Sequence, residues 1–127
     1  MQLTKNFSKS EFDCSCGCDM PKEVLNNVQK VANQLQALRN IVGKSITVNS
    51  GYRCSEYNTK VGGVKTSQHI LGKASDIVIK DMTSDDVAHL IEQIIDSGDM
   101  LQGGLGRYNT FTHYDIRKTK ARWNFKN

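Results

Sequence analysis

The chain has 127 residues, of which 38% are hydrophobic and 24% are charged, and its net charge is +4. A chain of this length forms one domain and buries about two thirds of the surface that its unfolded form exposes. We therefore expect a single domain over residues 1–127 with a real hydrophobic core. The mild positive charge excludes an acidic disordered protein and falls short of the dense basic surface of a dedicated nucleic-acid binder, so a nucleic-acid partner is not expected.

Membrane insertion is not expected either. No apolar run approaches the ~18–20 residues that a membrane-spanning helix needs. The N-terminal residues Met1–Phe7 contain a lysine but are not followed by the hydrophobic stretch of a secretory signal. These observations predict a monomer that is cytoplasmic as synthesised, with no membrane insertion.

The first part of the chain predicts an irregular arm, a helix and a strand. Residues 1–20 are poor in apolar side chains, and they form the predicted arm. Pro21 suits the first turn of a helix, and Gly43 suits its C-terminal end. Between them, apolar residues recur at steps of three and four, which is typical of one buried helix face: Val24, Val28, Val31, Leu35 and Leu38. Ile46–Asn49 is short and β-branched, as in a strand.

The rest of the chain predicts one further helix and three strands. A long polar stretch, Tyr52–Gly72, is interpreted as a loop, and loops of this length in small domains are usually functional. The predicted strands are Ala74–Ile79, Gly103–Tyr108 and Thr112–Arg117, the last two forming a hairpin around Asn109 and Thr110. The predicted helix is capped by Thr83 or Ser84, buries Val87, Leu90, Ile91, Ile94 and Ile95, and ends at Gly98. Residues 118–127 form a basic tail. Separate runs of helix and antiparallel strand predict the α+β class, with a small, mostly antiparallel sheet flanked by helices.

Two of the three histidines stand in unusual places. His69 closes the long loop, and Asp76 lies in the following apolar strand, where a carboxylate is costly to bury without a cation or a donor. A zinc ion would satisfy it, with His113 from the distant hairpin as a third ligand. The spacing alone leaves open a buried aspartate bound to the backbone beside two unrelated histidines. The third histidine, His89, is interpreted as a surface residue.

Five segments, in their order along the chain, resemble the zinc D-alanyl-D-alanine carboxypeptidase family, which includes the L-alanyl-D-glutamate endopeptidases of phage endolysins. They are Ser50–Cys54 (SGYRC), Val61–Val64 (VGGV), Ser67–Ile77 (SQHILGKASDI), Gly104–Tyr108 (GLGRY) and Phe111–Arg117 (FTHYDIR). The family shares its fold with lysostaphin-type peptidases and the hedgehog signalling domain. The resemblance extends from about Phe7 to Trp123.

The resemblance implies that His69, Asp76 and His113 bind one catalytic zinc ion, Zn2+. It implies a hydrolase, a metallopeptidase that cuts peptide bonds in the stem or cross-link peptides of bacterial peptidoglycan, as a carboxypeptidase or as an endolysin-type endopeptidase. The alternative is a catalytically silent zinc-containing module of the same fold that binds cell wall or protein. The small size and the missing signal fit a phage product in cell wall degradation, released by a membrane-permeabilising partner or carried in a virion.

The sequence departs from relatives that place a carboxylate just upstream of the last zinc histidine, because Thr110–Thr112 contains none. Asp115 is the nearest carboxylate and is a candidate general base, since alternation puts it on the same strand face as His113 and Arg117. It could equally orient a ligand histidine or be neutralised by Arg117. Arg53 is a candidate for stabilising the oxyanion or binding a substrate carboxylate. The remaining candidates for substrate binding are Ser67, Gln68 and Tyr108.

The four cysteines pose a separate question. Cys14, Cys16 and Cys18 alternate with other residues in the arm, and Cys54 follows Arg53. Four thiolates can hold a structural zinc ion, although the one-residue gaps are tighter than usual. Disulfides, in an oxidising compartment, and free thiols are the two alternatives.

Overall fold

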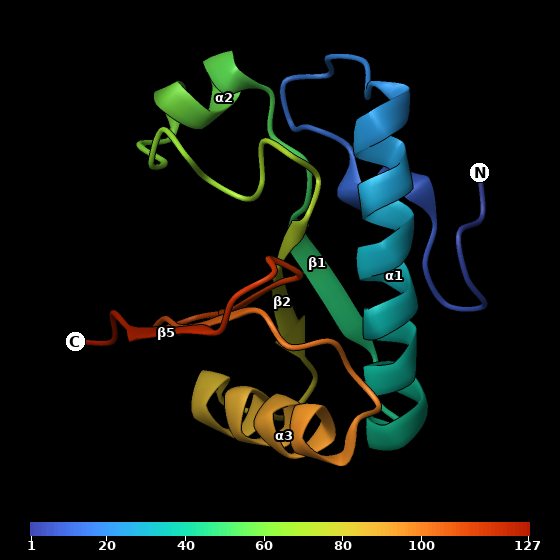
Figure 1. Cartoon of the computed structure of the whole chain (residues 1–127), viewed down its shortest axis with the longest axis vertical. Helices are drawn as coiled ribbons and strands as arrows, with labels where there is room; N and C mark the ends of the chain where they lie inside the picture. The colour runs from blue at the N-terminus through green and yellow to red at the C-terminus, as the bar shows by residue number, and fades with distance from the viewer.

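A five-stranded sheet and three α-helices make up most of the computed structural model, which describes residues 1–127 (Figure 1). A short 3-10 helix in the arm, η1, precedes them. The α+β class predicted from the sequence is confirmed. The element bounds, in chain order, are η1 Lys9–Phe12, α1 Lys22–Val42, β1 Ile46–Ser50, α2 Ser55–Lys60, β2 Ala74–Ile79, α3 Ser84–Ser97, β3 Gly104–Arg107, β4 Thr112–Asp115 and β5 Ala121–Asn124.

The two long helices begin and end where the sequence predicts. α1 starts directly after Pro21 and ends at Gly43, which has a φ of 67° and donates its N–H to the Arg39 carbonyl. In α3, the Thr83 side chain accepts the N–H of Asp86, whose carboxylate accepts the N–H of Thr83 in return. This capping box satisfies two backbone donors at the start of the helix. Gly98 ends α3 with a φ of 87°.

The sheet has the order β1-β2-β4-β3-β5, and its only parallel pair is β3 with β5. Strand alternation divides its residues between two faces. On one face, Ile77 of β2 and Tyr114 of β4 are fully buried in the hydrophobic core. On the other face, Asp76 and His113 lie directly opposite one another in the β2–β4 register. The register therefore assigns packing to one face and polar chemistry to the other.

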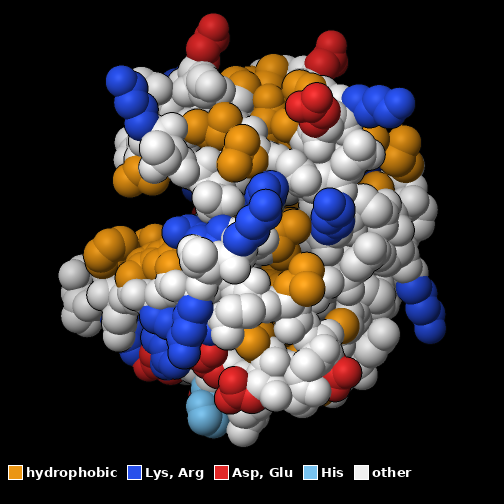
Figure 2. Space-filling model, viewed as in Figure 1, with side chains coloured by type: hydrophobic (Ala, Val, Ile, Leu, Met, Phe, Trp, Pro, Cys, Tyr) orange, Lys and Arg blue, Asp and Glu red, His pale blue; other side chains and the backbone are white.

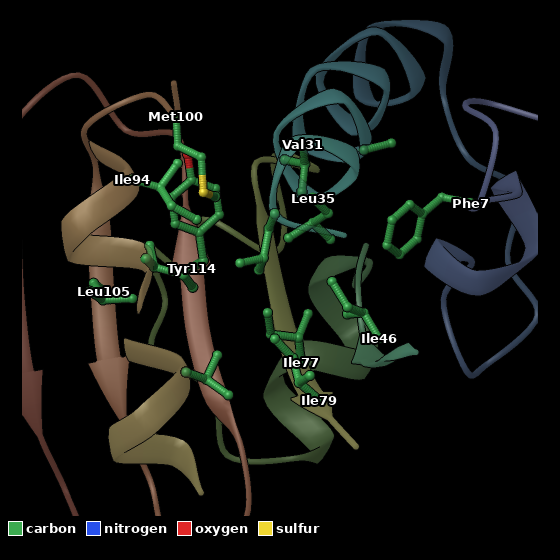
Figure 3. Close-up of a cluster of buried hydrophobic side chains, with 14 of the residues drawn as sticks. Phe7, Val31, Leu35, Ile46, Ile77, Ile79, Ile94, Met100, Leu105 and Tyr114 are labelled. Atoms are coloured by element: carbon green, nitrogen blue, oxygen red, sulfur yellow. The ribbon is translucent and has the colours of Figure 1, made fainter. Parts of the chain in front are cut away.

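The core fills the space between the sheet and the helices α1 and α3 (Figure 3). α1 contributes Val31 and Leu35, and α3 contributes Ile91 and Ile94. All of these side chains are at most 4% exposed. None of the helices is both long and apolar enough to cross a membrane.

Three segments differ from the sequence prediction. The arm is irregular apart from η1, but it places Phe7 and Phe12 in the core at 1% and 0% exposure. The predicted loop contains α2, whose sequence SEYNTK has no apolar periodicity by which to recognise it. The predicted tail contains β5, an edge strand of four residues that pairs with β3 and whose short alternation of apolar and polar residues the sequence prediction did not use. The predicted hairpin is present with shorter strands, closed by a hydrogen bond from the Tyr108 N–H to the Phe111 carbonyl.

Candidate metal centre

Three side chains from separate parts of the chain meet on the polar face of the sheet. Asp76 Oδ1 lies 3.0 Å from His113 Nδ1 and 3.3 Å from His69 Nε2. His69 comes from the loop before β2, whereas the other two belong to the central strands β2 and β4. All three are buried, and their potential ligand atoms lie within 4.8 Å of one another. The structure thus brings together the trio that the sequence nominated as metal ligands.

The orientation of His69 is set by the backbone. Its Nδ1 lies 2.7 Å from the carbonyl oxygen of Gly51. A carbonyl can only accept a hydrogen bond, so this contact requires the proton on Nδ1 and leaves the Nε2 lone pair free. The backbone N–H of His69 donates to Ser67 Oγ, which fixes the turn that carries the ring. His69 is therefore held in the tautomer that can bind a cation through Nε2.

His113 is held from behind by a carboxylate. Its Nε2 lies 2.7 Å from Asp115 Oδ2, which leaves Nδ1 directed at Asp76. Asp115 is fully buried and also accepts hydrogen bonds from the Gly104 backbone and from the Arg117 backbone and guanidinium. Histidines that bind metals commonly donate their second N–H to a carboxylate in this way.

Burial and hydrogen bonding oppose each other in setting the charges of this cluster. Burial raises the pKa of Asp76, but the two histidine rings, which donate to its carboxylate when they are protonated, outweigh burial and hold the pKa well below its usual range. Burial also raises the pKa of Asp115, and the hydrogen bonds from His113 and Arg117 lower it further than burial raises it. For His113, burial lowers the pKa, and the two aspartates raise it above its ordinary value. Both carboxylates are thus ionised at neutral pH.

The donor set fits a zinc ion. Two imidazole lone pairs, on His69 Nε2 and His113 Nδ1, face one ionised carboxylate, and each ring has its second nitrogen occupied by an acceptor. Two nitrogens and one oxygen are common ligands of catalytic zinc, which keeps its fourth position for water or substrate.

The trio lines a cavity of about 450 Å³. In Figure 2 this cavity is visible as a notch between the surface over α2 with its following loop and the surface over β5. Apolar and aromatic side chains form part of its wall: Val61, Val64, Tyr108, Phe111, Trp123 and Phe125. Two guanidinium groups, of Arg53 and Arg117, also line it. The cavity therefore combines apolar surface with positive charge beside the candidate metal ligands.

Arg53 is fixed on three sides. Its Nε donates to Ser50 Oγ at 3.1 Å, its Nη1 to Asn58 Oδ1 at 3.2 Å and its Nη2 to Asp76 Oδ2 at 3.3 Å. Asn58, in α2, is 2% exposed and also donates to the Val64 carbonyl. Asn58 was not predicted from the sequence, because an isolated polar residue in a polar segment gives no periodic signal.

The other candidates for substrate binding also line the cavity, with different surroundings. The Ser67 hydroxyl oxygen already accepts the backbone N–H of His69. Gln68 lies beside it. The Tyr108 ring stacks on Phe111 with centroids 4.3 Å apart, and its hydroxyl accepts the indole N–H of Trp123.

The placement of Asp115 favours a role other than that of general base. Asp115 is 0% exposed and does not line the cavity, whereas a general base must come within hydrogen-bond reach of the proton that it removes. The only carboxylate in the cavity wall is Asp76. The contacts match the two other roles that the sequence left open for Asp115, since it orients His113 and is paired with the Arg117 guanidinium.

The four cysteines gather in a second cluster, which does not line the cavity. Their sulfur atoms lie within 4.8 Å of one another, and none is paired in a disulfide.

Comparison with known proteins supplies two matches. The family model described as Peptidase M15 matches residues 3–115. A 45-residue stretch is 47% identical to the zinc D-Ala-D-Ala carboxypeptidase of Streptomyces albus G. This stretch covers 35% of the present chain and 18% of that protein, so the alignment spans less than a fifth of the relative.

Proposed function

The chain belongs to the Peptidase M15 family, a family of zinc metallopeptidases, and we propose that it hydrolyses peptide bonds in the stem or cross-link peptides of bacterial peptidoglycan. The observation that carries this proposal is the meeting of two free imidazole lone pairs and one ionised carboxylate in the wall of an open cavity. The zinc D-Ala-D-Ala carboxypeptidase relative supports the choice of substrate.

The zinc-binding residues are His69, Asp76 and His113. A zinc ion held there would polarise the scissile carbonyl and lower the pKa of a water molecule. Asp115 is a positioning residue, since it keeps the His113 proton on Nε2 and aims Nδ1 at the zinc position. The Gly51 carbonyl oxygen holds the His69 proton on Nδ1 and so leaves Nε2 for the zinc ion.

Arg53 is the candidate for binding the anionic part of the substrate. A guanidinium has five N–H donors, and three of those of Arg53 are used by Ser50, Asn58 and Asp76. The remaining two belong to Nη1 and Nη2, in a side chain that lines the cavity. They suit either a terminal substrate carboxylate or the oxyanion that develops at the scissile carbonyl. The aromatic wall around Tyr108 would pack on the apolar parts of the peptide.

The decisive experiment is mass spectrometry of peptidoglycan peptides after incubation with the zinc-loaded protein. We expect cleavage that a chelator abolishes and zinc restores. His69→Ala should reduce cleavage to background, whereas His89→Ala, at an exposed position outside the cavity, should leave it unchanged. A stem peptide and its C-terminal amide distinguish the two modes, because a carboxypeptidase that binds the terminal carboxylate through Arg53 should reject the amide.

A second candidate function is a zinc-containing module that binds wall peptides without cutting them. It is favoured by the absence from the cavity wall of any carboxylate other than Asp76 that could serve as a general base. The same incubation separates the two functions, since binding to purified sacculi with no released fragment supports the silent module. With either function, the protein would have to reach the cell wall. If it is made without a secretory signal, a phage-type partner would release it or a virion would carry it.

A further inference from the structure

A second cluster of potential metal ligands lies outside the cavity. We call it the cysteine cluster: Cys14, Cys16, Cys18 and Cys54. Three of its members come from the arm after η1, and the fourth is the N-terminal capping residue of α2. The Sγ atom of Cys16 lies 3.2 Å from that of Cys14 and 3.5 Å from that of Cys54. The Sγ atoms of Cys14 and Cys54 are 3.9 Å apart.

The backbone of the arm is shaped to bring these sulfur atoms together. Gly17 has a φ of 84°, in the left-handed region that favours glycine, and its N–H donates to the Cys14 carbonyl at 2.9 Å. This turn reverses the chain between Cys14 and Gly17. Across the cluster, the backbone N–H of Cys54 is directed at Cys14 Sγ, 3.5 Å away. An amide directed at sulfur stabilises the negative charge of a thiolate, as do the outer hydrogen bonds of metal ligands in general.

The spacing of the sulfur atoms matches one shared ion better than pairs of bonded cysteines. With zinc–sulfur bonds of about 2.3 Å and tetrahedral geometry, two ligand sulfurs lie roughly 3.8 Å apart. The three separations above, from 3.2 to 3.9 Å, fall around that value. A disulfide would single out one partner for each sulfur, whereas Cys14, Cys16 and Cys54 each have two close neighbours. Four converging thiols are the ligand set of a closed structural zinc site.

We propose that the cysteine cluster binds a second zinc ion, structural in character, that fastens the arm to the segment leading into the active site. That segment is already in close contact with the arm. Gly51 leaves no room for a side chain, because a Cβ there would lie 2.7 Å from Phe12 Cα. The N–H of Tyr52 donates to the Phe12 carbonyl at 2.8 Å.

The same segment orients two residues of the metal centre. The Gly51 carbonyl fixes the tautomer of His69, and Arg53, next to Cys54, donates to Asp76. An ion in the cysteine cluster would therefore hold the N-terminal end of α2 and the arm in fixed relation to the zinc ligands. Such an ion would hold the arm in place whether or not the protein cleaves peptides.

The test is metal analysis of the full chain purified under reducing conditions with zinc. We expect two zinc ions per chain in the wild type and one in His69→Ala. Replacement of zinc by cobalt in His69→Ala should give the thiolate-to-cobalt charge-transfer absorption and the intense visible bands of a tetrahedral sulfur site. A wild-type protein with one zinc ion and no thiolate absorption would overturn the proposal.

Two variants at the exposed Cys16 form a matched pair. Cys16→Ser should lose the thiolate-bound ion, whereas Cys16→His should retain it, because three cysteines and one histidine also form stable zinc sites. Mass spectrometry of the native protein without added reductant distinguishes the remaining alternative. Disulfides within the cluster, or four thiols that react freely in the presence of zinc, would contradict the proposal, and protection of the thiols until a chelator is added would support it.

Discussion

The metal centre on the sheet and the cysteine cluster at the arm are built by different means. At the metal centre, Asp76 and His113 are placed by strand register, and each histidine is held from behind by an acceptor. At the cysteine cluster, the sulfur atoms come from an irregular arm and from the first turn of a six-residue helix. The sheet places the ligands of the first site, whereas a turn in the arm and the burial of Phe7 and Phe12 in the core bring together the sulfur atoms of the second.

The largest expected effect is the loss of stability when Phe12 is replaced, which tests whether its burial in the core anchors the arm. Phe12→Ala should lower the free energy of unfolding by about 3–5 kcal/mol, because it removes a fully buried aromatic ring from the core. Urea denaturation with the cysteine cluster loaded with zinc measures this loss. Phe125→Ala is the control, since that ring is 65% exposed. A loss for Phe12→Ala no larger than for the control would mean that the ion alone holds the arm.

The next largest effect is expected at the metal centre, when Gly104 is replaced by alanine. A Cβ at Gly104 would lie 2.2 Å from Asp115 Oδ2, so Gly104→Ala must displace the carboxylate that holds His113. We expect a loss of about 1–3 kcal/mol in the free energy of unfolding from overpacking. Isothermal titration should also show weaker zinc binding at the metal centre. The thiolate–cobalt absorption of the cysteine cluster serves as the internal control and should be unchanged.

Asp115→Asn separates positioning from proton transfer. The amide keeps the shape of the side chain but loses the charge that stabilises the His113 N–H, so zinc affinity should fall by about 10–100-fold. Cleavage should fall with it and recover when zinc is raised. In the zinc-free protein, NMR titration should show a lower pKa for His113, since Asp115 raises it in the wild type.

A different result would return Asp115 to the role of general base. In that case cleavage would stay low at saturating zinc, and the acidic limb of the pH–rate profile would disappear.

The smallest expected effect is at the surface of the arm. Lys9 and Asp13 form an ion pair of 2.7 Å, with both side chains partly exposed. Lys9→Ala should change the free energy of unfolding by less than about 0.5 kcal/mol, because such pairs are screened by solvent. A larger loss by urea denaturation would show that surface charge, in addition to burial and the cysteine cluster, holds the arm.

The parts of the fold that were predictable are those with a repeated signal. α1 was legible from apolar residues at helical spacing and from its terminal glycine, Gly43. Phe7 and Phe12 gave no such signal, because two aromatic residues five positions apart in a polar segment match neither a helix nor a strand. β5 was missed because its alternation of apolar and polar residues, ARWN, is short and lies in a segment that its basic charge marked as a tail.

The residues of the candidate site also differ in whether the sequence could predict them. The sequence pattern, together with the resemblance to a family, nominated His69, Asp76 and His113 as metal ligands, and strand alternation correctly put His113 and Asp115 on one face. Alternation does not report depth, so the complete burial of Asp115 emerged only from the structure. Asn58 likewise became visible only through its contact with Arg53.

The position of β5 bears on how this protein can be joined to another. The strand lies at the edge of the sheet next to β3 (Figure 1). Trp123 and Phe125 form part of the cavity wall. A tag or second domain attached after Asn127 would therefore start at the mouth of the cavity, where its high local concentration could block peptide entry or assist it. Attachment before Met1, on the other side of the molecule in Figure 1, would leave the mouth clear.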